Sequence, residues 1–247
     1  MEVISVHVPK TAGSTFGNLL TTIHGVDRVY KDYEDYPMNP LSRYNLDREG
    51  WRESARAEVQ SIGEPYRAVH GHFAIRKYDG FFPEARRIAW VRHPAAWVTS
   101  LYYFWKGLKE LPPGSPNPLI VRLRNEDLPL REFAEDPTVR DRIAGTFLEG
   151  LEPEAFFFLG VQEHFDSEIR DLIGMMGWPE VSAGFENRNP VPGYADRSRE
   201  ILGDRTLTEL LIALNPRDME LYEAASRIRE ERARRRVHFL TSASGTV

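Results

Sequence analysis

A lysine, a glycine and several hydroxyl residues stand together near the start of the chain, in the stretch "HVPKTAGSTF". It follows a short apolar run and precedes apolar residues at helical spacing, so it should join a strand to a helix. The free N–H groups and positive dipole of a helix N-terminus stabilise an anion. Lys10 supplies charge, and Gly13 lets the backbone approach closely. Thr11, Ser14 and Thr15 add hydroxyl donors, so the set predicts a phosphate-binding loop.

The same residues also fit a purely structural turn, with Ser14 as the helix N-cap and Lys10 in solvent. They do not fit the common P-loop, Gly-x-x-x-x-Gly-Lys-Ser/Thr, in which the lysine follows the loop and the hydroxyl binds magnesium. Here Lys10 precedes the loop, and no Gly-Lys pair occurs at it. We therefore expect no metal at this loop.

A second candidate phosphate site lies in "VRHPAAWVTSLYYFW", where Arg92 ends a predicted strand and Ser100 follows eight positions later on a predicted helix. A guanidinium can form two hydrogen bonds to phosphate oxygens, and a hydroxyl two helical turns later can donate from the same side. Taken singly, Arg92 could equally form a structural ion pair and Ser100 could be an ordinary helix residue. Taken together with the first loop, they favour a phosphate-binding role.

Two histidines, His70 and His72, alternate at the end of a predicted strand in "VHGHFAI". Alternation sends both side chains to the same face, so they could lie side by side in a cleft. We expect His72 to accept a proton as a general base, and His70 to orient it or contact the acceptor. The sequence does not decide which of the two is the base, and a pair satisfied by backbone groups is the structural alternative.

The first two motifs resemble those of sulfotransferases that use 3′-phosphoadenosine 5′-phosphosulfate (PAPS). The resemblance implies that the 5′-phosphosulfate is held by Lys10, Thr11, Ala12, Gly13, Ser14 and Thr15. It places Arg92 and Ser100 at the 3′-phosphate. The His-x-His stretch resembles that of heparan sulfate 2-O-sulfotransferase and its uronyl relatives, in which the second histidine is the base.

This resemblance implies metal-independent transfer of a sulfuryl group to a hydroxyl of a carbohydrate or small molecule, leaving 3′-phosphoadenosine 5′-phosphate (PAP). The chain also departs from the family: Trp97 stands where relatives often carry arginine, and His93 where they often carry aspartate. Polymeric heparan sulfate is therefore a doubtful acceptor. Two rival functions remain, a P-loop nucleotide kinase and a non-catalytic nucleotide-binding module that would need Lys10 and Arg92 but not His72.

Alternating strands and helices must position these motifs. Four apolar runs predict buried strands, at residues 3–8, 66–73, 86–94 and 154–161, and helical patterns follow them. We therefore predict one α/β domain over residues 1–247, with a central, mostly parallel sheet flanked by helices; the resemblance implies the P-loop-like sulfotransferase fold.

Loops should complete the predicted domain. Residues 30–50 read as an irregular excursion and 187–198 as a loop, and two last helices should break near Asn215. We expect residues 30–44 and 112–124 to line the acceptor pocket, with Arg122 or Arg124 meeting an acidic group.

The composition limits the remaining classes of function. The 247 residues carry a formal charge of −5, which argues against a protein that coats nucleic acid. The absence of cysteine removes disulfides and thiolate chemistry. No run approaches the ~20 apolar residues of a membrane span, and no signal-peptide pattern is present, so we expect a cytoplasmic protein.

Overall fold

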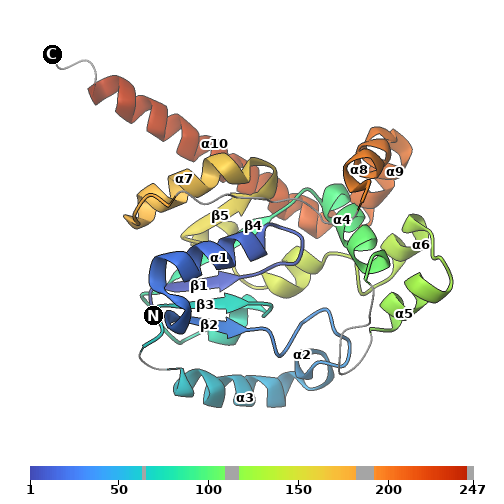
Figure 1. Ribbon diagram of the computed structural model, residues 1–247, viewed down its shortest axis with the longest axis horizontal. Helices are drawn as coiled ribbons and strands as arrows, with labels where there is room; N and C mark the ends of the chain where they lie inside the picture. Colours follow the sequence, from blue (N-terminus) through green and yellow to red (C-terminus); the bar gives the residue numbers. More distant parts are fainter. Residues whose placement is uncertain (63–64, 109–116, 182–191, 244–247) are drawn as a thin grey trace.

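Five parallel strands form the central sheet of the computed structural model, which describes residues 1–62, 65–108, 117–181 and 192–243, with side chains to residue 236. Their order across the sheet is β2-β3-β1-β4-β5 (Figure 1). The strands are β1 (Val3–Val6), β2 (Val29–Asp32), β3 (Ala68–Gly71), β4 (Arg86–Val91) and β5 (Phe158–Val161). The predicted single α/β domain with a central sheet flanked by helices is confirmed, and the sheet is parallel throughout.

Helices cover both faces of this sheet. They are α1 (Gly13–His24), α2 (Arg43–Leu46), α3 (Arg48–Ser61), α4 (Pro94–Lys106), α5 (Pro118–Asn125), α6 (Leu130–Glu135), α7 (Phe165–Met176), α8 (Tyr194–Gly203), α9 (Arg205–Ala213) and α10 (Pro216–Ala243). Short turns of other helix types are η1 (Val26–Arg28), η2 (Ile75–Tyr78), η3 (Ile143–Phe147), η4 (Pro153–Ala155) and η5 (Gln162–His164). The predicted break near Asn215 separates α9 from α10.

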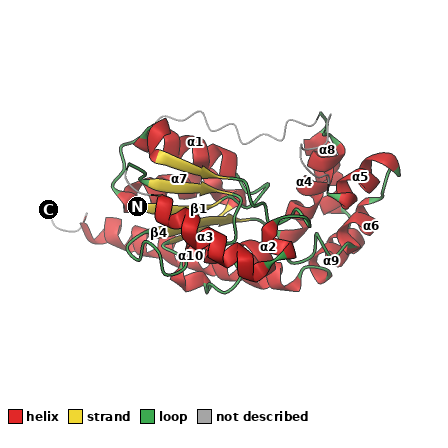
Figure 2. Cartoon of the chain, turned by 90° about the horizontal axis from the view of Figure 1, so that it is seen from below, coloured by secondary structure: helices red, strands yellow, loops and turns green. Residues whose placement is uncertain are grey.

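Alternate residues of each strand enter two separate apolar cores. Val3 of β1 packs with Phe16 of α1 and Leu172 of α7, whereas Ile4 packs on the opposite face with Val59 of α3. Burial on both faces explains why β1, β5 and the second half of β4 are mostly apolar. Figure 2 shows α4, α5, α6, α8 and α9 gathered at one end of the sheet.

The strand order changes direction at β1, because β2 and β3 lie on one side of it and β4 and β5 lie on the other. This strand pairs with β3 on one side, where Val6 lies opposite Gly71, and with β4 on the other, where Val6 lies opposite Ala89. Ligands of open α/β sheets bind beyond the carboxyl ends of strands at such a switch point. The segments that follow β1, β3 and β4 carry the three predicted motifs and therefore meet at one edge.

Two predicted loops contain regular structure instead. Residues 30–50 include most of β2 and the start of α3, and residues 187–198 include the start of α8. The β2 strand has only four residues and ends in Lys31 and Asp32, so it carries little apolar signal. It is fixed by long-range contacts: the buried Lys77 ammonium lies 2.9 Å from the Asp32 carboxylate, and the Tyr78 hydroxyl donates to the same group at 2.8 Å.

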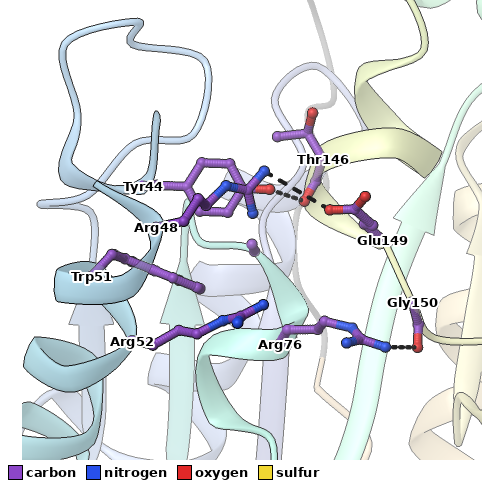
Figure 3. Close-up of a pocket in the computed structure, with 9 residues that line it drawn as sticks. Tyr44, Arg48, Trp51, Arg52, Arg76, Thr146, Glu149 and Gly150 are labelled. Carbon is purple, nitrogen blue, oxygen red and sulfur yellow. Dashed lines mark hydrogen bonds and ion pairs between the residues drawn. The ribbon is translucent and has the colours of Figure 1, made fainter. Parts of the chain in front are cut away.

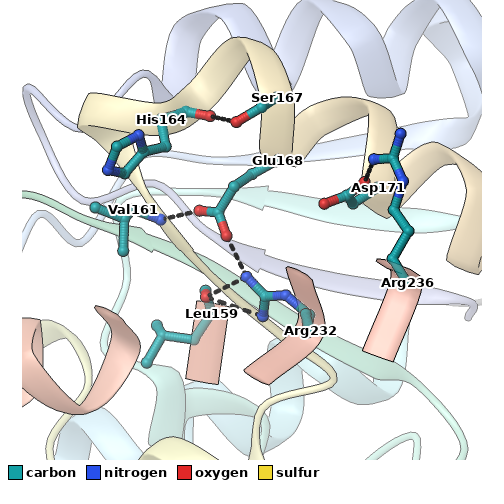
Figure 4. Close-up of polar contacts among 8 residues, drawn as sticks. All are labelled: Leu159, Val161, His164, Ser167, Glu168, Asp171, Arg232 and Arg236. Atoms are coloured by element: carbon teal, nitrogen blue, oxygen red, sulfur yellow. Dashed lines mark hydrogen bonds and ion pairs between the residues drawn. The ribbon is translucent and has the colours of Figure 1, made fainter. Parts of the chain in front are cut away.

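A buried ion pair fastens α7 and α10 to β5 (Figure 4). One carboxylate oxygen of Glu168 accepts from the Val161 backbone N–H at 2.5 Å, and the other pairs with Arg232. The Arg232 guanidinium also donates to the Leu159 carbonyl at 3.3 Å. The Glu168 side chain is 2% exposed, so its charge depends on these partners rather than on water.

Replacing Arg232 with alanine should leave the Glu168 carboxylate buried without its counter-charge. We expect Arg232→Ala to lower the free energy of unfolding by about 3–5 kcal/mol, as breaking a buried pair does. Arg236→Ala is the matched control, because Arg236 pairs with Asp171 at the surface and such pairs contribute about 0–1 kcal/mol. Urea unfolding followed by circular dichroism measures both losses, and equal losses would contradict the assignment.

Candidate functional site

The loop between β1 and α1 has a tightly constrained backbone. Lys10 and Ala12 adopt positive φ angles of 64° and 72°, which non-glycine residues rarely occupy. The Thr11 hydroxyl donates to the Val8 carbonyl at 2.8 Å, and the Trp97 indole donates to the Pro9 carbonyl at 2.8 Å. Surrounding contacts therefore hold the strained loop in one shape, as is common at functional sites.

The start of α1 lacks a side-chain cap. Its N-cap residue is Ala12, which makes no side-chain hydrogen bond, so the interpretation of Ser14 as the cap is wrong. The backbone N–H groups of Gly13, Ser14 and Thr15 donate to no acceptor among the residues that the structure describes. These groups and the helix dipole give the loop its capacity to bind an anion. The predicted hydroxyl donors differ: Thr11 is buried and engaged within the loop, whereas Ser14 is exposed.

Lys10 and Arg92 lie together although 82 positions separate them in the sequence. The Arg92 Nη1 donates to the Lys10 carbonyl at 3.1 Å, and the Lys10 ammonium lies 4.1 Å from the centre of the Phe104 ring. Lys10 is therefore not in solvent. Burial, and then the charge of Arg92, lower the pKa of Lys10 to about 8. Within the described ranges neither cation pairs with a carboxylate, so the site carries uncompensated positive charge.

Ser100 faces the same site from α4 and is 1% exposed. Its hydroxyl lies near the phenol of Tyr194 and lowers the pKa of that phenol, and the phenol oxygen accepts from Arg92 Nη2 at 3.3 Å. The predicted pair of Arg92 and Ser100 thus converges on a single oxygen atom. Tyr194 carried no signal in the sequence, because it lies in a segment that reads as a loop.

His72 lies just beyond β3 and is held by the backbone of the first motif. Its Nδ1 lies 2.6 Å from the carbonyl oxygen of His7. A carbonyl can only accept, so Nδ1 carries the proton and Nε2 keeps its lone pair. The Tyr33 ring and the His72 imidazole meet edge to face with centroids 4.9 Å apart, and the Tyr36 ring lies 5.0 Å from the same imidazole. His72 is partly exposed and can meet an incoming proton donor.

His70 occupies a different environment. It is fully buried, its Nδ1 lies 2.9 Å from the Ser5 hydroxyl, and its ring faces Gly17 of α1 so closely that a Cβ there would lie 2.6 Å from Nε2. The expectation that His70 contacts the acceptor does not fit this burial. Its position supports a structural role, in which it packs between the His7 ring and Gly17 of α1.

His7 joins the two predicted histidines and was not predicted to do so. Its ring stacks on His70 at 5.2 Å and lies 4.2 Å from that of His72, and its Nδ1 is 3.2 Å from the Tyr33 hydroxyl. A Cβ on Gly13 would lie 1.8 Å from the His7 ring. Gly13 is therefore needed to make room for His7, in addition to the ligand approach that we predicted for it. Strand periodicity alone gave no reason to connect His7 with the later pair.

All three rings are neutral near pH 7. Burial lowers the pKa of His70 to about 3 and that of His72 to about 4, while the His7 carbonyl partly opposes the change at His72. Burial, followed by the neighbouring His72 and His70, also lowers the pKa of His7 far below its usual value. A neutral His72 has the protonation state that a general base requires.

A basic cavity of about 340 Å³ opens beside α3 (Figure 3). Arg48, Arg52 and Arg76 line it together with Trp51, and Glu149 is its one acidic lining residue. Arg48 lies 3.9 Å from Glu149, and Arg76 donates to the Gly150 carbonyl at 3.1 Å. Arg52 has no partner in the part of the chain that the structure describes. The cavity also includes Ala74, two positions after His72.

The structure describes only part of the segments that we expected to line the acceptor pocket. Tyr44 lines the basic cavity, and residues 112–116 lie outside the described residues. Arg122 pairs with Glu126 on the surface of α5, with 3.4 Å between the charged atoms. The arginines of the basic cavity were missed because they lie on α3 and η2, in segments without a recognisable motif.

Within the described ranges there is no group of three or more histidine, cysteine, aspartate or glutamate side chains that could hold a metal ion. The helices described here include none with the length and apolar character that crossing a bilayer requires. A scan against protein-family models finds no match to the chain, and a search of curated proteins finds no significant match.

The neutral histidines predict that the fold loses stability in acid. Unfolded histidines bind protons near pH 6.5, whereas His70 and His72 resist protonation until about pH 3–4. The free energy of unfolding should therefore fall as pH drops from 6.5 towards 4, by up to about 1.4 kcal/mol per pH unit for each histidine. Urea unfolding between pH 7.5 and 4.5 measures this slope.

Replacing a buried histidine tests the source of that slope. His70→Gln should make the slope shallower, while His164→Gln, at an exposed histidine outside the cluster, should leave it unchanged. Equal slopes for the two variants would show that the buried rings do not cause the acid sensitivity.

Proposed function

We propose that this protein is a sulfotransferase that moves a sulfuryl group from PAPS to an acceptor hydroxyl. The observation that carries the proposal is the convergence of Lys10 and Arg92, two cations without carboxylate partners among the described residues. His72 is bound to the carbonyl of His7, three positions before Lys10, and its Nε2 has no partner in the described ranges. A ligand with anionic groups at two positions matches the two cations. Transfer of a sulfuryl group to a hydroxyl requires a base to accept the hydroxyl proton, and His72 can serve as that base.

The loop before α1 would hold the 5′-phosphosulfate. The unpartnered N–H groups of Gly13, Ser14 and Thr15 and the Lys10 ammonium supply donors without any metal ligand in the loop. Arg92 and Ser100 would hold the 3′-phosphate at the other end of the nucleotide. Binding energy from that remote phosphate would orient the reacting end.

His72 would act as the general base. As the acceptor oxygen attacks sulfur, its proton moves to His72 Nε2, a new S–O bond forms, and the bond from sulfur to the bridging phosphate oxygen breaks. The products are a sulfate ester and PAP, and the Lys10 ammonium stabilises the charge that develops on the bridging oxygen. The hydrogen bond from Nδ1 to the His7 carbonyl favours the imidazolium that forms.

The basic cavity supports an acidic acceptor, either a carbohydrate or a smaller molecule. Arg52 offers a guanidinium without a partner among the described residues, and Trp51 offers a ring on which a sugar or aryl group can stack. An acceptor carboxylate or sulfate bound here would extend towards the end of β3, where His72 lies.

Nucleotide preference is the first experiment. Thermal unfolding is measured with 3′,5′-adenosine bisphosphate and, separately, with ATP and magnesium. A ligand at a hundred times its dissociation constant stabilises by ~2.7 kcal/mol, a rise of roughly 5–10 °C for a domain of this size. We expect that rise with the bisphosphate alone. A rise with ATP and magnesium alone would favour the nucleotide kinase.

The catalytic step is tested by His72→Gln. We expect the sulfuryl transfer rate to fall about 10²–10⁴-fold, the usual contribution of a general base, with bisphosphate affinity kept within about twofold. Transfer of radiolabelled sulfate from PAPS to a panel of acidic sugars measures the rate. Full activity in the variant would remove the role of His72, and bisphosphate binding without transfer in wild type would favour the non-catalytic module.

A further inference from the structure

The phenol of Tyr194 lies at the predicted 3′-phosphate site. Tyr194 begins α8, and its oxygen accepts from Arg92 Nη2 at 3.3 Å. The hydroxyls of Ser100 and Ser198 lie near the same oxygen and lower the pKa of the phenol. Two of these three partners are the residues that the sequence assigned to a phosphate. The phenol oxygen is therefore surrounded as a phosphate oxygen would be.

The ionisation of this phenol agrees with the geometry. Burial by itself raises the pKa of Tyr194, but the charge of Arg92 and the hydrogen bonds from Ser100, Ser198 and Arg92 outweigh it, so the pKa is lowered. The site therefore stabilises negative charge on an oxygen at this position. Arg92 Nε is also buried without a hydrogen-bond partner among the described residues, so the guanidinium can make a further bond.

We propose that the Tyr194 hydroxyl occupies the place of a 3′-phosphate oxygen in the nucleotide-free protein, and that a nucleotide must displace it to bind fully. The inference rests on the proposed function, because it takes Arg92 and Ser100 as the 3′-phosphate site. Tyr194 then contributes to specificity. A nucleotide with a 3′-phosphate replaces the bonds of the phenol with stronger charged ones, whereas a nucleotide without it offers nothing in exchange.

The attachment of α8 allows such a displacement. Within this helix, all of which is described, Ser198 is the single buried residue. The residue before the helix is Gly193, whose φ of 71° is readily adopted only by glycine. The Tyr194 ring meets Tyr103 of α4 edge to face at 6.1 Å, and the Arg197 guanidinium lies 5.7 Å from the centre of the Tyr103 ring. The helix packs against α4 and α9 mainly through half-buried and exposed side chains, so a local shift breaks few fully buried contacts.

Tyr194→Phe tests the inference because it removes only the hydroxyl. Titration calorimetry measures the affinity of wild type and variant for 3′,5′-adenosine bisphosphate and for 5′-AMP. We expect the variant to bind the bisphosphate at least about fivefold more tightly, since no phenol competes for Arg92 and Ser100. Its affinity for 5′-AMP should stay within about twofold.

Tyr103→Phe is the matched control, because it makes the same chemical change on the neighbouring ring and should alter neither affinity. Weaker binding of the bisphosphate by Tyr194→Phe would mean that the phenol is a ligand of the phosphate and would overturn the displacement. An unchanged affinity would overturn it as well. Unfolding of each variant without ligand checks that the fold is intact.

The proposed function and the role of Tyr194 are contradicted by different results. If wild type binds ATP with magnesium and ignores the bisphosphate, the proposed function is wrong and the inference falls with it. If wild type binds the bisphosphate more tightly than 5′-AMP but Tyr194→Phe leaves that preference unchanged, only the role of Tyr194 is wrong. An ultraviolet difference spectrum gives an independent readout: the bisphosphate should change tyrosine absorbance in wild type and much less in Tyr194→Phe.

Discussion

The site depends on one electrostatic constraint: two cations lie close together, partly removed from water, without an acidic side chain of the described chain to neutralise them. Lys10 rests on an aromatic ring, and Arg92 bonds to a carbonyl and a phenol. Such an arrangement is unfavourable until an anion arrives. The pKa of Lys10 is lowered for the same reason, because burial and the charge of Arg92 both disfavour the protonated ammonium.

The fold brings this charge together by the order of its strands. Because β1 lies between β3 and β4, the loop before α1, His72 and Arg92 reach one edge from three separate parts of the sequence. The loop itself is held by the Trp97 indole, which donates to the Pro9 carbonyl from α4. Packing therefore presents the backbone N–H groups before any ligand binds, which reduces the ordering cost of binding.

Sequence patterns predicted the parts of the structure that follow from local chemistry. The βα alternation predicted a parallel α/β domain, and the two phosphate motifs predicted the meeting of Lys10 with Arg92. Long-range contacts were not predictable in this way. The β2 strand depends on a buried lysine 45 positions away, and His7 and Tyr194 gain their importance from rings and donors on other elements.

Comparing the binding of two nucleotides, one with and one without a 3′-phosphate, tests the central claim most directly. The affinities of 3′,5′-adenosine bisphosphate and 5′-AMP are measured for wild type, Lys10→Met and Arg92→Met. The account predicts that Arg92→Met weakens the bisphosphate by about 10- to 100-fold and barely affects 5′-AMP, while Lys10→Met weakens both. Equal losses for both nucleotides in Arg92→Met would mean that Arg92 only shapes the loop, and that no separate 3′-phosphate site exists.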